Sequence, residues 1–388
     1  MEGVNDILCG NCLEILKSFD ENSIDAIITD PPYELGFMGK SWDKSGIAFN
    51  TEVWSECLRV LKPGGHMLAF GGSRTFHRIA VAIEDAGFEL RDTIMWVYGS
   101  GFPKSLDISK AIDKMAGIWR GKAQGKLSNY ASMSGPNYSR TPKENPATPE
   151  AQMWEGWGTA LKPAFEPIIL ARKPISEKNI AENVLKWGTG GINIDDCRIP
   201  LKGERQPTGS GKPSKNGVTY NLAIKSGGNG GNRTPQQGRW LANFIHDGSE
   251  EVLRLFPETK STPRTPTNGG TGGVGQSTNF QRGSETSPYR DSGSAARFFY
   301  CAKASRKERG EGNNHPTVKS LALMQYLVRL ITPPNGIVLD PFTGSGSTLI
   351  AAIREGFKYI GIELNEEYIE IAEKRLQAEQ PLFEYNNT

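Results

Sequence analysis

The chain has 388 residues, of which 37% are hydrophobic, and its formal net charge is only +2. This is enough apolar material for one large core and a smaller domain, and no apolar run reaches the roughly 20 residues that span a bilayer. Because the amino terminus lacks the basic-then-apolar order of a signal peptide, we expect a cytoplasmic protein with no membrane partner.

The five cysteines, at positions 9, 12, 57, 197 and 301, are odd in number and scattered. This pattern argues against a disulfide framework. Cys9 and Cys12 have the spacing of metal ligands, but no second pair accompanies them, so we predict buried thiols and no metal.

The first 98 residues alternate between apolar runs of strand character and segments with helical apolar spacing. The predicted elements are strands at 7–9, 24–29, 66–70 and 90–98 and helices at 12–19, 51–61 and 73–86, with residues 62–65 as a stop and Ser73 as an N-cap. This alternation predicts an α/β fold with a doubly wound, mostly parallel sheet.

The tetrapeptide Asp30-Pro31-Pro32-Tyr33 directly follows the predicted strand at 24–29. Two prolines at this point prevent both further strand pairing and an immediate helix. We therefore expect the carboxylate and the ring in a fixed loop at the carboxyl end of a strand, the edge where open α/β sheets bind ligands. A plain turn with a capping carboxylate remains the alternative.

The tetrapeptide suits the alkylation of an exocyclic amino group on a base. Such an amine is a poor nucleophile because its lone pair is delocalised into the ring. The Asp30 carboxylate and the Pro31 carbonyl can accept its two N–H bonds and draw the nitrogen toward tetrahedral geometry. Tyr33 offers a face on which an everted base can stack.

The alternation weakens after residue 99. We predict a helix at 107–119, a polar stretch at about 120–150, and a strand at 164–171 that pairs antiparallel with the sheet. Residues 175–310 then read as an irregular module with long Gly-rich loops and short apolar islands. Residues 201–310 carry a net charge of +9, which leaves −7 for the remainder and suggests contact with a polyanion, although a merely solvated basic region would look the same.

The last 70 residues return to the α/β pattern. The predicted elements are helices at 317–330, 348–355 and 366–377 and strands at 336–339 and 359–361. A Gly-rich turn at 340–348 joins a strand to a helix, and Gly344 and Gly346 allow its backbone to approach a ligand closely.

The chemistry of this turn points to a nucleoside that carries an amino acid. Asp340 places a carboxylate where a pyrophosphate would be repelled and an ammonium group attracted. Glu363 closes the following strand, where a ribose-diol acceptor sits in nucleoside-binding sheets. The ligand implied is S-adenosylmethionine, with a dinucleotide or a purely structural turn as alternatives.

Together, these residues resemble the amino-type DNA methyltransferases of the β arrangement. In that group the Asp-Pro-Pro-Tyr motif comes first, the target-recognition region second and the Phe-x-Gly-x-Gly loop last. Asp30–Tyr33, the basic module and Phe342–Gly346 stand in that order. Segments 157–163 and 315–319 also resemble the group. Gly10-Asn11 replaces its Gly-Asp, and Ser320 stands where it usually has proline.

The resemblance implies a catalytic half at 1–174 with a loop insert at about 120–150, a target-recognition region at 175–312 and a cofactor-binding half at 313–388. It assigns the base to Asp30, Pro31, Pro32 and Tyr33. The residues it assigns to the cofactor are Asn11, Asp30, Thr317, Lys319, Asp340, Pro341, Phe342, Gly344, Gly346, Ser347, Thr348 and Glu363. Within this set, Thr317 and Lys319 would reach the methionine carboxylate. The candidate DNA contacts are Lys40, Trp42, Arg233, Arg239 and Arg297.

The function that follows is site-specific transfer of a methyl group from S-adenosylmethionine to adenine N6 in double-stranded DNA, by base flipping and direct in-line transfer. Cytosine N4 is the alternative base, and a non-catalytic regulator that binds cofactor and DNA is the alternative class. We further expect a bacterial, phage or prophage origin, a homodimer as one possible assembly, and a restriction endonuclease as one possible partner.

Overall fold

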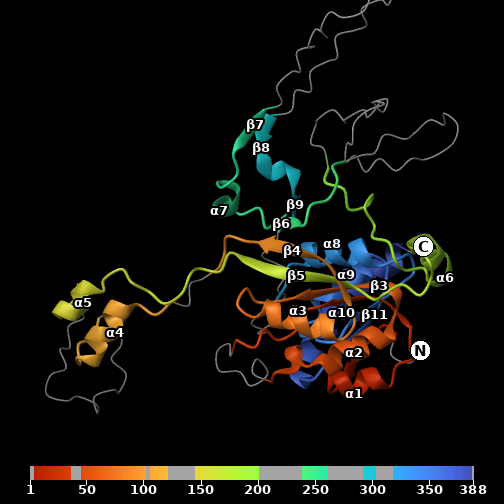
Figure 1. Cartoon of the computed structure of the whole chain (residues 1–388), viewed down its shortest axis with the longest axis horizontal. Helices are drawn as coiled ribbons and strands as arrows, with labels where there is room; N and C mark the ends of the chain where they lie inside the picture. Colours follow the sequence, from red (N-terminus) through yellow and green to blue (C-terminus); the bar gives the residue numbers. More distant parts are fainter. Residues whose placement is uncertain are drawn as a thin grey trace, which may run out of the picture. The chain divides into compact units, whose positions relative to one another are not determined.

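The computed structural model describes residues 4–35, 45–101, 105–120, 145–200, 238–260, 292–302 and 318–386. The chain divides into two compact units (Figure 1). The first, here called the sheet unit, comprises Met1–Gly99 and Phe165–Thr388. The second, here called the helical unit, comprises Ser100–Ala164.

The sheet unit is built on a nine-stranded sheet with the order β1-β11-β10-β2-β3-β5-β4-β6-β9. These strands are β1 Asp6–Cys9, β2 Ile24–Thr29, β3 Leu61–Phe70, β4 Glu89–Val97, β5 Phe165–Arg172, β6 Phe244–His246, β9 Tyr300–Cys301, β10 Ile337–Asp340 and β11 Lys358–Glu363. Among the described strands of this sheet, β5 alone pairs antiparallel with its neighbours, β3 and β4. The predicted doubly wound, mostly parallel fold and its antiparallel strand are confirmed.

Two layers of helices bury opposite faces of this sheet (Figure 1). One layer contains α1 Cys12–Lys17, α2 Thr51–Val60 and α3 Phe76–Asp85, with the short 3-10 turn η3 Ile47–Phe49 beside them. The other contains α8 Leu321–Ile331, α9 Ser347–Arg354 and α10 Glu366–Asn386. Along β3, Met67 faces the first layer and Leu68 the second, because successive strand residues point to opposite faces.

Two predicted boundaries differ from the structure. The helix that residues 62–65 were predicted to stop does end before them, at Val60, but the strand predicted at 66–70 begins earlier. Residues 62–65 already belong to β3, where a register shift against β2 absorbs them and Gly64 takes a φ of +78°. Helix α3 begins at Phe76 and is not capped by Ser73. The hydroxyl of Thr75, the residue at the cap position, instead donates to the Tyr33 carbonyl at 2.7 Å, and this fixes the loop that carries the tetrapeptide.

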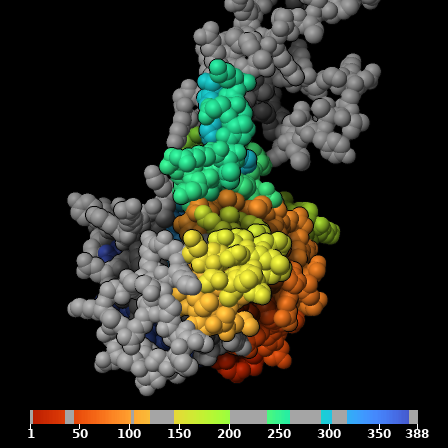
Figure 2. All heavy atoms as spheres, turned by 90° about the vertical axis from the view of Figure 1, so that its left-hand side faces the viewer, coloured from red at the N-terminus to blue at the C-terminus, as the bar shows by residue number. Residues whose placement is uncertain are grey.

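The segment after β5 contributes more regular structure than its composition indicates. Helix α6, Ile180–Trp187, was not predicted, although Asn179 and Glu182 form a capping pair at its start. Strands β6 and β9 extend the main sheet beyond β4. Helix α7 (Glu250–Leu253), strands β7 (Glu258–Lys260) and β8 (Ser292–Ser294), and the turn η4 (Ala295–Phe298) gather in the green and cyan block of Figure 2.

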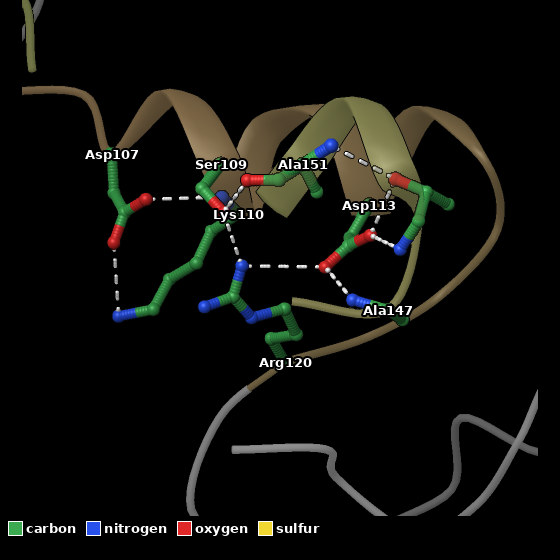
Figure 3. Close-up of polar contacts among 8 residues, drawn as sticks. Asp107, Ser109, Lys110, Asp113, Arg120, Ala147 and Ala151 are labelled. Atoms are coloured by element: carbon green, nitrogen blue, oxygen red, sulfur yellow. Dashed lines mark hydrogen bonds and ion pairs between the residues drawn. The ribbon is translucent and has the colours of Figure 1, made fainter. Parts of the chain in front are cut away.

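The helical unit pairs α4, Ile108–Met115, with α5, Pro149–Met153. The fully buried carboxylate of Asp113 accepts hydrogen bonds from the backbone N–H groups of Ala147 and Thr148 and from Arg120 (Figure 3). Asp113 therefore ties residues on both sides of segment 121–144 to one helix.

Across all described helices of the protein, none is long and apolar enough to cross a membrane.

Candidate active site at the carboxyl edge of the sheet

The two motifs of the sequence, 310 positions apart, meet at one edge of the sheet. Strands β2 and β10 are parallel neighbours, and both motifs follow their carboxyl ends. The hydroxyl of Thr29, immediately before the tetrapeptide, donates to Asp340 Oδ1 at 2.7 Å. The tetrapeptide and the Gly-rich turn are therefore directly linked.

A partly buried ionic network surrounds the Asp30 carboxylate. The Lys319 ammonium lies 2.7 Å from Asp30 Oδ2, 3.0 Å from the Tyr33 hydroxyl and 3.1 Å from Glu166 Oε2. The Tyr33 hydroxyl in turn donates to Glu166 Oε2 at 3.0 Å. Asp30 Oδ1 is buried and has no hydrogen-bond partner among the described residues. A buried acceptor without a partner is costly, so this atom is suited to receive a donor from a ligand.

Burial and charge set the protonation of this network. Burial raises the pKa of Asp30, the Lys319 ammonium opposes that rise, and the Glu166 carboxylate adds to it. Burial lowers the pKa of Lys319, but the adjacent Asp30 and Glu166 carboxylates outweigh it and hold the pKa above its ordinary value. Lys319 therefore stays a cation between two carboxylates.

The ring of Tyr33 is held from several sides. The Thr75 hydroxyl fixes its carbonyl, and the Lys319 ammonium lies 5.2 Å from its ring centroid. A side chain at Gly72 would place its Cβ only 3.2 Å from Tyr33 Cδ2, so the absence of one leaves room for the ring. The Lys319 ammonium also lies 4.8 Å from the Phe70 ring centroid. The site thus presents an aromatic face with a fixed orientation.

Asp340 anchors the Gly-rich turn from within. Its carboxylate accepts from Thr29, from the Phe342 backbone N–H at 3.1 Å and from the Thr348 hydroxyl at 2.6 Å. Burial raises the pKa of Asp340 to about 6, although these three hydrogen bonds oppose the rise. Asp340 therefore supports the turn, whatever it contacts in a ligand.

Glu363 closes the other side of the turn. Its carboxylate accepts from the backbone N–H groups of Gly344 at 2.8 Å and Asn365 at 2.9 Å, and burial raises its pKa. Gly344 and Gly346 take φ values of +53° and +80°, which only glycine adopts readily. Cys9 pairs with Glu363 in the sheet register, which brings the neighbouring Asn11 to the same edge, where its side chain caps α1.

The groups around the Gly-rich turn fit a nucleoside that carries an amino acid. Phe342, Gly344 and Glu363 are partly exposed, whereas Pro341, Gly346, Ser347 and Thr348 are buried behind them. The accessible groups are thus an aromatic face, a close backbone and a carboxylate, which can hold a base and a ribose diol. The free oxygen of Asp30 lies at the adjacent strand end.

The predicted site residues have different outcomes. The structure brings Asp30, Tyr33 and Lys319 together, but Lys319 contacts Asp30 and Glu166 and not the Gly-rich turn. Its predicted contact with a methionine carboxylate stays a prediction. Thr317, Lys40, Trp42 and Arg233 lie outside the described residues.

Of the candidate DNA contacts, the two described arginines share an aromatic partner. The guanidinium carbons of Arg239 and Arg297 lie 4.6 Å and 4.3 Å from the Phe298 ring centroid. Arg198 lies 5.2 Å from the neighbouring Trp240 ring, which is 62% exposed. These residues combine positive charge with aromatic rings, of which that of Trp240 is well exposed.

A cavity of about 400 Å³ lies elsewhere in the sheet unit, lined by Asn193, Asp196, Arg329, Thr332, Pro334, Glu355 and Phe357. Thr332 and Pro334 precede β10, and Phe357 precedes β11, so this cavity is at the amino-terminal edge of the sheet. It has no part in the site formed by Asp30 and the Gly-rich turn.

Two residues near Asp30 belong to no motif of the sequence: Glu166, and Tyr98, whose pKa is raised by burial and by the Glu166 carboxylate. A signal was available. Glu166 is the one charged residue at the start of the apolar strand that was predicted to run antiparallel. Because an antiparallel strand begins at the edge where its parallel neighbours end, that residue had to come close to Asp30.

Comparisons with known proteins identify relatives along most of the chain. The sequence model of a family described as DNA methylase matches residues 24–374. The type II methyltransferase M.HindIII of Haemophilus influenzae is 23% identical to this chain. The matched region spans 96% of this chain and 94% of that protein. The DNA adenine methyltransferase YhdJ of Escherichia coli is 48% identical over 66 residues, which are 17% of this chain and 22% of that protein. The solved complex of M1.HpyAVI with SAM has a TM-score of 0.41 and 19% identity over 95% of this chain and 98% of that one.

Proposed function

The chain belongs to this DNA methylase family and uses S-adenosylmethionine as its methyl donor, and from that premise we propose that it methylates adenine N6 at specific sites in double-stranded DNA. The observation that carries the proposal is the Asp30 carboxylate. One of its oxygens is bound to Lys319, while the other is buried without a partner among the described residues. That free oxygen is suited to accept an N–H group of a base amine.

The tetrapeptide would prepare the amine in three ways. Asp30 Oδ1 and the Pro31 carbonyl would accept hydrogen bonds from its two N–H groups, and this geometry directs the nitrogen lone pair away from the ring. The Tyr33 ring stacks on the base after it leaves the duplex and offsets part of the few kcal/mol that unstacking costs. The raised pKa of Asp30 makes its carboxylate a better acceptor for the proton that the amine loses.

The Gly-rich turn would hold the cofactor. S-adenosylmethionine supplies an electrophilic methyl group on a sulfonium centre. Glu363 would accept from the ribose hydroxyls, Phe342 would contact the base, and the backbone at Gly344 would allow close approach. Asn11, Asp340, Pro341, Gly346, Ser347 and Thr348 complete the proposed site. Because Thr29 links Asp340 to the tetrapeptide, the two half-sites are held at neighbouring strand ends.

The choice of adenine rests on the tetrapeptide and on one relative. The Asp-Pro-Pro-Tyr sequence resembles adenine-specific members of the family, whereas cytosine-N4 members more often begin with serine. The name of YhdJ states adenine for that protein. Cytosine N4 remains the second candidate, because its amine presents the same two N–H bonds. A regulator without activity is disfavoured by the intact tetrapeptide.

We propose that residues 175–312 form the target-recognition region and that Arg239 and Arg297 contact DNA through the cluster around Phe298. Both arginines stack on Phe298 and retain their charge, and Arg297 also donates to the backbone carbonyls of Gly293 and Ser294. A charged guanidinium held in this way can neutralise a phosphate or reach a base edge. Segments 1–174 and 313–388 would then be the catalytic and cofactor-binding halves. A homodimer and a cognate restriction endonuclease stay predictions.

One experiment tests the base, the site and the activity together. The full chain is expressed in a host without DNA amino-methylation, and the host DNA is read by single-molecule sequencing and by mass spectrometry of its nucleosides. We expect N6-methyladenine at one short motif, and none in cells that express Asp30→Ala. N4-methylcytosine in its place would transfer the proposal to the second base, and unmodified DNA with soluble protein would refute the enzyme.

A further inference from the structure

Glu166 lies outside both sequence motifs, yet its side chain contacts Tyr33 and Lys319 in the site. It lies opposite Trp96 of β4 at the start of β5, which runs antiparallel to β3 and β4. Its carboxylate accepts from the Tyr33 hydroxyl at 3.0 Å and lies 3.1 Å from Lys319 Nζ. Glu166 is therefore connected to the tetrapeptide by two routes, one through the hydroxyl and one through the ammonium.

Lys319 is held by three oxygens within this network. An ammonium group has three N–H bonds, and three oxygens surround it, from Asp30, Tyr33 and Glu166. Its side chain is only 11% exposed, so water contributes little to its solvation. Two hydrogen bonds, to Asp30 and Tyr33, and the ion pair with Glu166 fix the position of the ammonium, and the ammonium in turn holds Asp30 Oδ2.

The geometry points to Glu166 as a positioning residue for methyl transfer: through Lys319 and the Tyr33 hydroxyl, it orients Asp30 so that Oδ1 faces the target amine and Tyr33 so that its ring faces the base. This inference rests on the proposed role of Asp30. It assigns Glu166 no contact with the substrate. If the Glu166 carboxylate were removed, Lys319 would lose its ion pair with Glu166 and the Tyr33 hydroxyl would lose the acceptor at 3.0 Å.

The charges support the same role. Two carboxylates and one ammonium leave the network with one net negative charge, and that favours the positive charge that develops on the amine during transfer. Two groups lie within hydrogen-bond or ionic reach of Asp30: Lys319, in the segment before α8, and Tyr33, in the same loop as Asp30. Glu166 from β5 and Asp340 from β10 add negative charge, and Tyr98 at the end of β4 faces Glu166.

The test compares Glu166→Gln and Glu166→Ala with the unaltered chain in single-turnover methyl transfer to unmethylated genomic DNA. We expect the rate constant to fall about 10-fold in the first variant and about 100-fold in the second, as loss of charge-assisted hydrogen bonds implies. Binding of S-adenosylmethionine, measured by calorimetry, should stay within about threefold. In Glu166→Gln the acid limb of the pH–rate profile should move to lower pH, because Glu166 raises the pKa of Asp30.

A double-mutant cycle separates positioning from a general structural role. If Glu166 acts through Lys319, Glu166→Gln should cost much less in a Lys319→Met background than in the unaltered chain. Losses in rate that simply multiply would overturn the inference, as would wild-type rates in Glu166→Ala. Glu166→Asp provides a second variant if the alanine form does not fold, and a rate restored above that of Glu166→Gln would support the role of the charge.

Glu89→Gln is the matched control. Glu89 lies on β4 and pairs with Arg172 at the far end of β5, so it is a carboxylate–cation pair between the same two strands, away from the site. Its rate should stay within about twofold of the unaltered chain. If Asp30→Ala retains activity, the proposed function fails; if Asp30→Ala is inactive while Glu166→Ala is normal, only the present inference fails.

Discussion

The hydroxyl of Thr29 donates to the carboxylate of Asp340 across 311 positions of the sequence. Each residue is the last of a buried parallel strand, and each is followed directly by one of the two motifs. This hydrogen bond holds the tetrapeptide and the Gly-rich turn at neighbouring strand ends. The proposed transfer depends on that proximity, because the methyl group and the amine must meet in one place.

Replacing Thr29 with valine keeps the shape of the side chain and removes its hydroxyl. The buried Asp340 carboxylate then keeps only the Thr348 hydroxyl and the Phe342 N–H, and we expect the free energy of unfolding to fall by about 1–3 kcal/mol. Urea denaturation measures this change. Thr29→Ser, which restores the hydroxyl, should recover most of it, and equal losses in both variants would contradict the role of the hydrogen bond.

Asp340→Asn should change how stability depends on pH. Burial raises the pKa of Asp340 to about 6 from its ordinary value of 3.8, so the folded chain binds this proton more tightly than the unfolded chain. The contribution of Asp340 is therefore fully present below pH 4 and is lost as the pH rises through 6. Relative to the unaltered protein, the asparagine variant should gain stability on the order of 2 kcal/mol between pH 4 and pH 7. Parallel denaturation curves across this range would exclude the effect.

Asp30→Ala should remove methyl transfer and spare the cofactor. The variant loses the acceptor for the amine, and we expect the single-turnover rate to fall by at least about 100-fold. Binding of S-adenosylmethionine, measured by calorimetry, should change only a few-fold, because the Gly-rich turn is built without the Asp30 side chain. Asp20→Ala, an exposed aspartate before β2, is the control. A large loss of cofactor binding would place Asp30 in a different role.

Asp113→Ala should destabilise the helical unit. It leaves the Arg120 guanidinium, whose side chain is 4% exposed, without its carboxylate, at a cost of about 3–5 kcal/mol. Amide hydrogen exchange should therefore accelerate across α4 and α5 while the sheet unit keeps its protection. Lys110→Ala removes only the solvent-exposed pair with Asp107 at 3.3 Å, leaves the Asp107 cap of α4 in place and should cost less than about 1 kcal/mol. Similar exchange in the two variants would show that burial of Asp113 contributes nothing.

Arg239→Gln should weaken DNA binding through charge. If Arg239 neutralises one phosphate, the slope of log affinity against log salt should become shallower by about 1, with no change in cofactor binding. Arg254→Gln is the matched control in the same region, because Arg254 is exposed and pairs only with Glu250 on its own helix among the described contacts. Equal effects of the two substitutions would argue against a specific role for the Phe298 cluster.

Local patterns in the sequence determined the α/β class, the positions of most strands and the two motifs. Alternating strand and helix segments predicted the doubly wound sheet, and the apolar run before Asp30 corresponds to β2 residue for residue. These features are local, because proline, glycine and apolar periodicity act within a few residues. The same locality explains why the start of β3 and the cap at Ser73 were predicted wrongly. Distant partners decided both: β2 for the start of β3, and Tyr33 for the hydroxyl of Thr75 at the cap position.

Tertiary structure alone decided which side chains share the site. The sequence could place Lys319 in a motif beside the cofactor turn, but not against Asp30, because that contact depends on how three chain segments meet at one edge. Glu166 reaches the network only because β5 runs antiparallel between β3 and β4 and so begins where its neighbours end. Burial then fixes the protonation of these groups, since the dielectric around a carboxylate is a property of the folded chain and not of its neighbours in sequence.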